Sequence, residues 1–150
     1  KVGHLLERVD LNVRTIDTLS YATSGSANRD NAFDTLIWAG MLRSLSTLGM
    51  YRRSVGPMVD AQSAINFVVS EETLPRSTIF CLKSIRSAIL DLKNNKGLLR
   101  VVDSAIRSVG NFNASKMRSK KSQQSIARLY NFSRKFTEEA TKTLFLPRQT

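Results

Sequence analysis

The apolar residues of the first nineteen positions recur at steps of three and four, and this pattern constrains the fold more than any other feature. They are Val2, Leu5, Leu6, Val9, Val13, Ile16 and Leu19. Residues at these steps share one face of an α-helix, because the helix completes a turn in about 3.6 residues. Only seven glycines and three prolines occur in the 150 residues, so few breakers interrupt similar patterns farther along the chain. The sequence therefore predicts an all-α fold.

The later apolar residues follow the same spacing and predict further helices. Together with the first, we expect helices near residues 2–21, 31–53, 57–69, 75–93, 98–109 and 122–144. Residues 110–121 are expected to form a longer, basic and mobile connection. The apolar stripes of these later helices include Phe33, Leu36, Met41, Met58, Leu92, Tyr130 and Leu144. Short connections between amphipathic helices favour an antiparallel bundle of five or six helices, in one domain over residues 1–150.

Positive charge is concentrated in the second half of the chain. Residues 1–75 hold 7 Lys and Arg against 8 Asp and Glu, whereas residues 76–150 hold 16 against 4, a net charge of +12. Two interpretations stay open: a solvated basic surface, or a helical domain that binds an anion or nucleic acid. The candidate basic patch is Lys116, Arg118, Lys120 and Lys121, whose composition suits contacts with phosphates. No aromatic residues alternate with these cations, as they do in proteins that bind single strands.

Several classes of function lack the residues that they need. His4 and Cys81 are the only imidazole and thiol, whereas common zinc sites need more ligands and a Cys–His nucleophile needs an adjacent pair. No nucleotide-binding, zinc or redox motif is present, and no apolar run approaches the length of a membrane span. We therefore expect no metal, no cofactor and no membrane span. A single cysteine is typical of the reducing cytoplasm, and the absence of an initiator methionine predicts a fragment of a longer protein.

Glu7 and Arg8 are the remaining candidates for a functional site. By helical geometry Glu7 lies almost opposite the apolar stripe and Arg8 at its edge, while His4 and Arg14 share the side of Glu7. This side is either an ordinary solvated face, whose charges contribute little, or a contact surface for a second layer of protein. Catalysis by Glu7 as an acid or base would need a nucleophile, a metal set or a phosphate loop, and the sequence offers none. The residues thus favour a non-catalytic role.

Four stretches in a fixed order resemble one bacterial family. They are Gly3-x-x-Leu6-Glu7-Arg8-x-Asp10-x-x-x-Arg14-x-x-Asp17, Trp38-x-x-x-Leu42-Arg43-Ser44-Leu45-Ser46, Tyr51-Arg52-Arg53, and residues 67–70 leading into residues 74–82. By these stretches the chain resembles the alpha-E family, an α-helical domain with a Glu-Arg motif on its first helix, over residues 1–92. Members of that family typically contain two such units, and the resemblance implies that this chain is the second, C-terminal unit.

The resemblance also implies a functional setting. Genes of the family tend to accompany an ATP-grasp ligase and transglutaminase-like peptidases, which suggests an accessory role in making or processing peptide bonds. The partner would then be an ATP-grasp ligase or a second alpha-E unit. The resemblance points to Glu7 as a carboxylate base or ligand, and to Arg8 as an anion clamp or as the ion-pair partner of Glu7.

Overall fold

The computed structural model describes residues 1–23 and 31–145, and this part of the chain is built from helices. The α-helices are α1 (Val2–Thr23), α2 (Asn31–Ser44), α3 (Leu48–Ser54), α4 (Ala61–Ser70), α5 (Thr78–Ile89), α6 (Lys96–Asn111), α7 (Lys120–Tyr130) and α8 (Phe132–Ala140). A 3₁₀ turn, η1 (Ala114–Lys116), precedes α7, and a π-helical turn, η2 (Thr141–Phe145), follows α8. The prediction of an all-α fold is confirmed.

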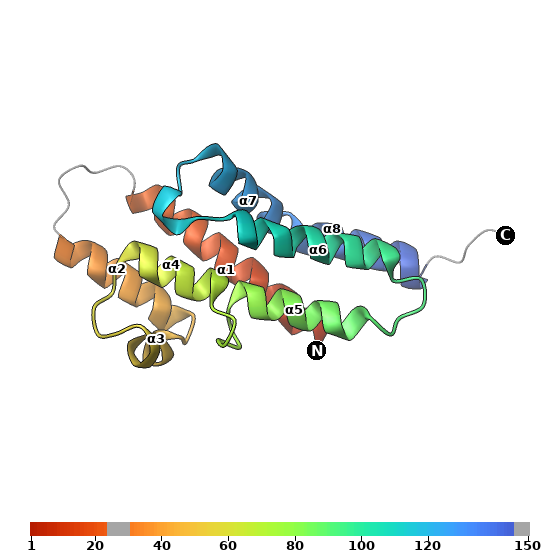
Figure 1. Cartoon of the computed structure of the whole chain (residues 1–150), viewed down its shortest axis with the longest axis horizontal. Helices are drawn as coiled ribbons and strands as arrows, with labels where there is room; N and C mark the ends of the chain where they lie inside the picture. The colour runs from red at the N-terminus through yellow and green to blue at the C-terminus, as the bar shows by residue number, and fades with distance from the viewer. Residues whose placement is uncertain (24–30, 146–150) are drawn as a thin grey trace.

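Four long helical segments form a closed ring around the main core. Helix α1 packs on α5, α5 packs on α6, and α6 packs on α7 and α8, which in turn pack back on α1. Neighbours in this ring run in opposite directions (Figure 1), as expected for helices joined by short connections. Helix α4 packs on both α2 and α5, so it joins the α2–α3 end of the molecule to the ring.

The helices are more numerous than the periodicity predicts, because two of the expected helices are divided. The first break follows α2, where Ser46 adopts a left-handed φ of 56° and the Thr47 hydroxyl donates a hydrogen bond to the Leu42 carbonyl at 3.1 Å. The second break is Asn131, whose side-chain amide donates to the Ala127 carbonyl at 2.9 Å. Serine, threonine and asparagine side chains compete with backbone groups for hydrogen bonds. The breaks therefore occur at residues that favour helix ends, where apolar spacing alone predicts continuous helices.

The main core is aliphatic on the α1 side, as predicted, with Val9, Val13 and Ile16 buried. Helix α2 departs from the prediction, because Leu36 is 70% exposed and Phe33 is half-exposed, whereas Trp38 is only 2% exposed. Its buried stripe is Trp38, Met41, Leu42 and, just after the helix, Leu45, so the predicted burial of Met41 is confirmed. This stripe has the same helical spacing as the predicted one and contains the largest side chain, so burying it removes more apolar surface from water.

Four other predicted core residues lie at the surface because the helices end earlier than expected or turn differently. Met58 precedes α4, which begins only after Asp60 caps its first turn by accepting a hydrogen bond from the Ser63 backbone N–H. Leu92 and Leu144 lie beyond the ends of α5 and α8 and are exposed. Tyr130 is also exposed, at the end of α7, where its hydroxyl contacts Arg14 of α1 instead of the core.

The prediction of a long connection over residues 110–121 is wrong. Helix α6 extends to Asn111, and the short η1 turn buries Ala114 against the core. The Ser122 hydroxyl donates to the carbonyl of Asn113 and accepts from its backbone N–H, both at 3.2 Å. The buried Ser122 hydroxyl thus satisfies both backbone groups of Asn113. These two hydrogen bonds hold the turn against the start of α7.

Asn12 is a buried polar residue that joins α1 to the segment that begins α5. Its side-chain amide donates to the Arg76 carbonyl at 2.9 Å and to the Thr78 hydroxyl at 3.3 Å. We predict that Asn12→Ala lowers the free energy of unfolding by about 1–3 kcal/mol, because it leaves buried acceptors without a donor. Urea denaturation measures this loss. The matched control, Asn66→Ala on the exposed side of α4, should change stability by less than about 0.5 kcal/mol, and equal losses would contradict the assignment.

Candidate functional site

The outer face of α1 presents two of the predicted site residues, His4 and Glu7, to solvent. Glu7 is 79% exposed, and its carboxylate lies 3.4 Å from Nδ1 of His4, which is also exposed. Leu11, one turn farther along the same side, is 51% exposed. An ion pair between two solvated side chains contributes little to stability. The His4–Glu7 contact is therefore a surface feature that a binding partner can reach.

Glu7 and Arg8 lie on different flanks of α1. No ion pair joins them in the described part of the chain, because successive helical residues differ by about 100° in direction. Arg8 is half-buried on the α5 side, where its positive charge acts on the thiol of Cys81. Burial raises the pKa of the Cys81 thiol, and the charge of Arg8 opposes this rise. The side chains of Glu7 and Arg8 therefore lie on the two sides of the outer face of α1 and do not form an ion pair within one pocket.

Arg14 is already bound within the domain. Its guanidinium donates to the Asp10 carboxylate at 2.6 Å and to the Tyr130 hydroxyl at 2.7 Å, and it lies 4.4 Å from the centre of the Tyr130 ring. The hydrogen bond to Asp10 raises the pKa of Arg14. These contacts hold α7 against α1, because the cation interacts with both the hydroxyl and the face of the aromatic ring.

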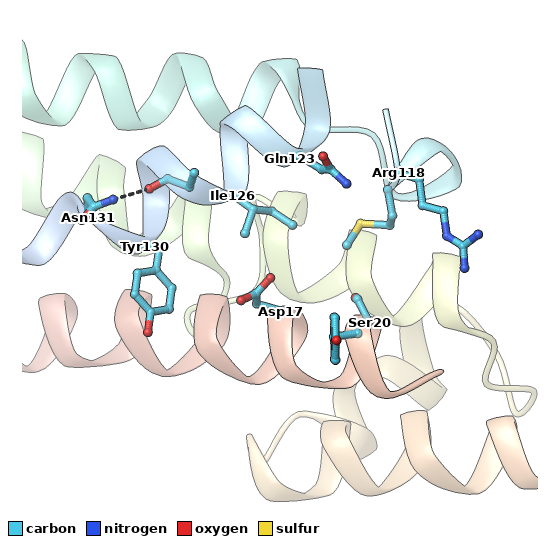
Figure 2. A pocket seen from close by; sticks show the side chains of 10 residues that line it. Asp17, Ser20, Arg118, Gln123, Ile126, Tyr130 and Asn131 are labelled. Atoms are coloured by element: carbon cyan, nitrogen blue, oxygen red, sulfur yellow. Dashed lines mark hydrogen bonds between the residues drawn. The ribbon is translucent and has the colours of Figure 1, made fainter. Parts of the chain in front are cut away.

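A groove runs between α1 and the α7–α8 segment, and the Arg14–Tyr130 contact divides it into two hollows. The hollow near Glu7 has a volume of about 290 Å³ and is also lined by Asp10, Arg134 and Thr137. The hollow toward the end of α1 has a volume of about 430 Å³. Figure 2 shows Asp17 and Ser20 rising from α1 toward Ile126 and Tyr130 of α7, with Arg118 at one end.

The structure brings only some of the predicted site residues together. Glu7 and Arg14 line the same hollow, and His4 contacts Glu7, but Arg8 lies on the opposite flank. Asp10 and Tyr130 belong to this groove and are absent from the predicted site. The Asp10–Arg14 spacing of four residues is a usable signal for an ion pair on a helix, whereas no local signal pairs Arg14 with a tyrosine 116 residues away.

The residues of the predicted basic patch do not share one hollow. Lys116, Lys120 and Lys121 are exposed between η1 and the first turn of α7. Arg118 lies beside them and lines the larger hollow of the α1–α7 groove. The patch is therefore an exposed turn, one residue of which contributes to the groove.

A second surface is more apolar and lies between α1 and α2. A hollow of about 550 Å³ is lined there mainly by apolar and hydroxyl side chains, together with the guanidinium-bearing Arg14. The other lining residues include Thr15, Thr18, Leu19, Leu36, Ile37 and Gly40. Leu11 lies on α1 one turn before Thr15, on the same side. We call this surface the α1–α2 face and define it by Leu11, Thr15, Thr18, Leu36 and Gly40. Leu36 lines the hollow, and Leu11 lies one turn of α1 before Thr15, among the charged groups of the outer face of α1.

Residues 1–23 and 31–145 contain no group of three or more His, Cys, Asp or Glu side chains placed to hold a metal ion. Within the same ranges, no helix combines the length and the apolar character that crossing a membrane requires.

Comparison of the sequence with models of known protein families identifies one family. The sequence model of alpha-E, described as a predicted alpha-helical domain with a conserved ER motif, matches residues 1–144. The chain belongs to the alpha-E family. The resemblance seen in residues 1–92 is thus confirmed, and the match of this alpha-E domain extends through α8. Glu7-Arg8 is the only place in the sequence where glutamate directly precedes arginine. No curated protein and no solved structure matches the chain.

Proposed function

We propose that this alpha-E domain is a non-catalytic module that binds a partner protein through the α1–α2 face. The observation that supports the proposal most is the exposure of Leu36 (70%), which lines a hollow of about 550 Å³, and of Leu11 (51%), which lies one turn of α1 before Thr15 at the edge of that hollow. Single exposed leucines are common, but exposed apolar side chains grouped around a hollow are typical of interaction surfaces. The face is thus a surface whose burial by a partner would be favourable.

In this proposal the Glu-Arg pair forms part of the rim of the α1–α2 face. Glu7 and Arg8 flank the outer side of α1 near Leu11, with the Glu7 carboxylate free to meet a cation on a partner. Protein interfaces commonly combine an apolar centre with a charged rim that determines orientation and association rate. We infer that the Glu-Arg motif selects and orients the partner, while the leucines contribute most of the binding energy.

The proposed partner is an ATP-grasp peptide ligase or a second alpha-E unit, as the family resemblance implies. In either case the domain would act in the cytoplasm as an accessory to peptide-bond formation or processing. The α1–α2 face supports a protein partner over a small molecule, because its two helices present an open surface, and Arg14, the charged residue that lines the hollow, is already bound to Asp10 and Tyr130.

Replacement of the two leucines tests this function. We predict that the double variant Leu11→Lys, Leu36→Lys weakens binding to the ATP-grasp ligase of the same genome, or to a second alpha-E unit, by at least about a hundredfold. The cause is the burial of two unpaired charges where the wild type buries apolar groups. Because both leucines are exposed in the free domain, the variant should keep the wild-type melting temperature.

A matched control adds the same charge elsewhere. Val55 and Leu90 are exposed to a similar degree and lie on the far ends of α3 and α5. The variant Val55→Lys, Leu90→Lys should bind within about threefold of the wild type. The variant Glu7→Lys should slow association more than it speeds dissociation, because Glu7 lies at the rim. Wild-type protein that binds neither candidate partner, or equal losses in both double variants, would contradict the proposed function.

Nucleic-acid binding by residues 76–150 is the second candidate function. The exposure of Lys116, Lys120 and Lys121 in one turn favours it, because clustered cations can neutralise phosphates and release counterions. Measurement of DNA affinity at two salt concentrations tests this candidate. If the cations contact phosphates, the affinity for DNA should fall steeply as the salt concentration rises. Absence of binding at low salt would remove it.

A further inference from the structure

The groove between α6 and the α7–α8 segment collects three cations around one hollow. Arg100 comes from α6, Arg128 from the last turn of α7 and Lys135 from α8. The hollow has a volume of about 250 Å³, its apolar lining includes Phe132, and Ser104 adds a hydroxyl. We call this site the cationic groove.

No carboxylate lines the cationic groove. The acidic residues of the helices around it are engaged with other cations: Asp103 with Arg86 at 2.8 Å, Glu138 with Arg134 at 2.6 Å, and Glu139 with Lys142 at 3.9 Å. The three groove cations are exposed and lack such partners among the described ion pairs. None of the three cations is held in an ion pair of the described part of the chain, so each is available to an anion bound between them.

The positive charge continues along the same groove. Arg107 follows Arg100 by seven residues on α6, and Lys121 precedes Arg128 by seven residues on α7. A step of seven residues is close to two helical turns, so each pair lies on one side of its helix. Both flanking residues are exposed. They extend the positive field beyond the hollow and would raise the rate at which an anion reaches it.

We propose that the cationic groove binds the phosphoryl group of a small phosphorylated ligand. Two guanidinium groups can each donate paired hydrogen bonds to phosphate oxygens, and Lys135 adds a third positive charge. Three cations match a doubly charged phosphoryl group better than a single carboxylate. The hollow is large enough for one or two phosphoryl groups, and the half-buried Val101 in its lining offers an apolar surface to the adjoining part of the ligand. This site involves helices outside the α1–α2 face, so it is independent of the proposed function.

Titration with pyrophosphate and with inorganic phosphate at low ionic strength tests the proposal. We expect pyrophosphate to bind the wild type and to shift the amide resonances of Ser104 and Phe132. Replacing Arg100, Arg128 and Lys135 together by glutamine should weaken pyrophosphate binding by at least about tenfold, because each contact removed is a charge-assisted hydrogen bond. All three residues are exposed, so the variant should remain folded.

The matched control removes the same charge from surfaces away from the groove. Arg52, Arg53 and Lys93 are exposed on α3 and after α5, and the variant with all three replaced by glutamine should bind within about threefold of the wild type. Equal weakening by both triple variants, or no binding of either phosphate by the wild type, would overturn the proposal. A DNA duplex provides the remaining comparison. The opposing outcome is that the duplex binds more tightly than pyrophosphate, with its affinity lowered equally in both triple variants. That result would assign anion binding to the basic surface as a whole and would also overturn the proposal.

Discussion

Truncation of Trp38 to alanine is expected to lower the free energy of unfolding by about 3–5 kcal/mol, as measured by urea denaturation. Trp38 is the largest fully buried side chain of the domain, and it lies on α2, which packs on α4. The loss combines the transfer of the indole to water with a cavity that the surrounding residues fill only in part. Trp38→Phe keeps more of the ring volume and should lose less, which provides a variant that folds if the alanine variant does not.

Leu36→Ala is the matched control on the same helix. Leu36 belongs to the apolar stripe that the sequence predicts to face the core, yet it is exposed. Its truncation should change the free energy of unfolding by less than about 0.5 kcal/mol. A larger loss at Leu36 than at Trp38 would mean that α2 buries the opposite side, and it would remove the α1–α2 face as an open surface.

Truncation of Phe132 to alanine is the second large expected effect, also about 3–5 kcal/mol. Phe132 is fully buried at the start of α8 and packs against Phe136, with ring centres 5.9 Å apart. Denaturation followed with two optical probes measures the loss. Both probes should report one cooperative unfolding transition, from which the free energy of unfolding is obtained.

Leu144→Ala is the control for this effect. The sequence predicts that Leu144 continues the apolar stripe of one long helix, but it lies exposed beyond α8. Its truncation should cost less than about 0.5 kcal/mol. Comparable losses at Phe132 and Leu144 would mean that Leu144 packs in the core, and would contradict its exposure in η2.

The helical fold was predictable because apolar spacing is local information. The stripe of Val9, Val13 and Ile16 on α1 is buried as its spacing requires. The buried side of α2 was not predictable, since Phe33 and Leu36 form one apolar stripe and Trp38 and Leu42 form another with similar spacing. The choice between them depends on how α2 packs on α4, which is a property of the whole fold.

The same distinction applies to the candidate site. The exposure of Glu7 and the position of Arg8 at the edge of the stripe follow from helical geometry and agree with the structure. The engagement of Arg14 by Tyr130 depends on a contact across 116 residues, so local spacing could not reveal it. The cationic groove was also hidden, because its three cations come from three helices whose packing the sequence pattern does not specify.

Hydrogen exchange in the presence and absence of a partner tests the central claim most directly, because it locates the bound surface without a mutation. The domain is compared alone and with the ATP-grasp ligase or a second alpha-E unit in excess. We predict that exchange slows in α2 around Leu36–Gly40 and in α1 around Leu11–Thr18, while α5 and α6 are unchanged. Slowing confined to α5 and α6, or no slowing with either partner, would contradict the assignment of the α1–α2 face as the docking surface.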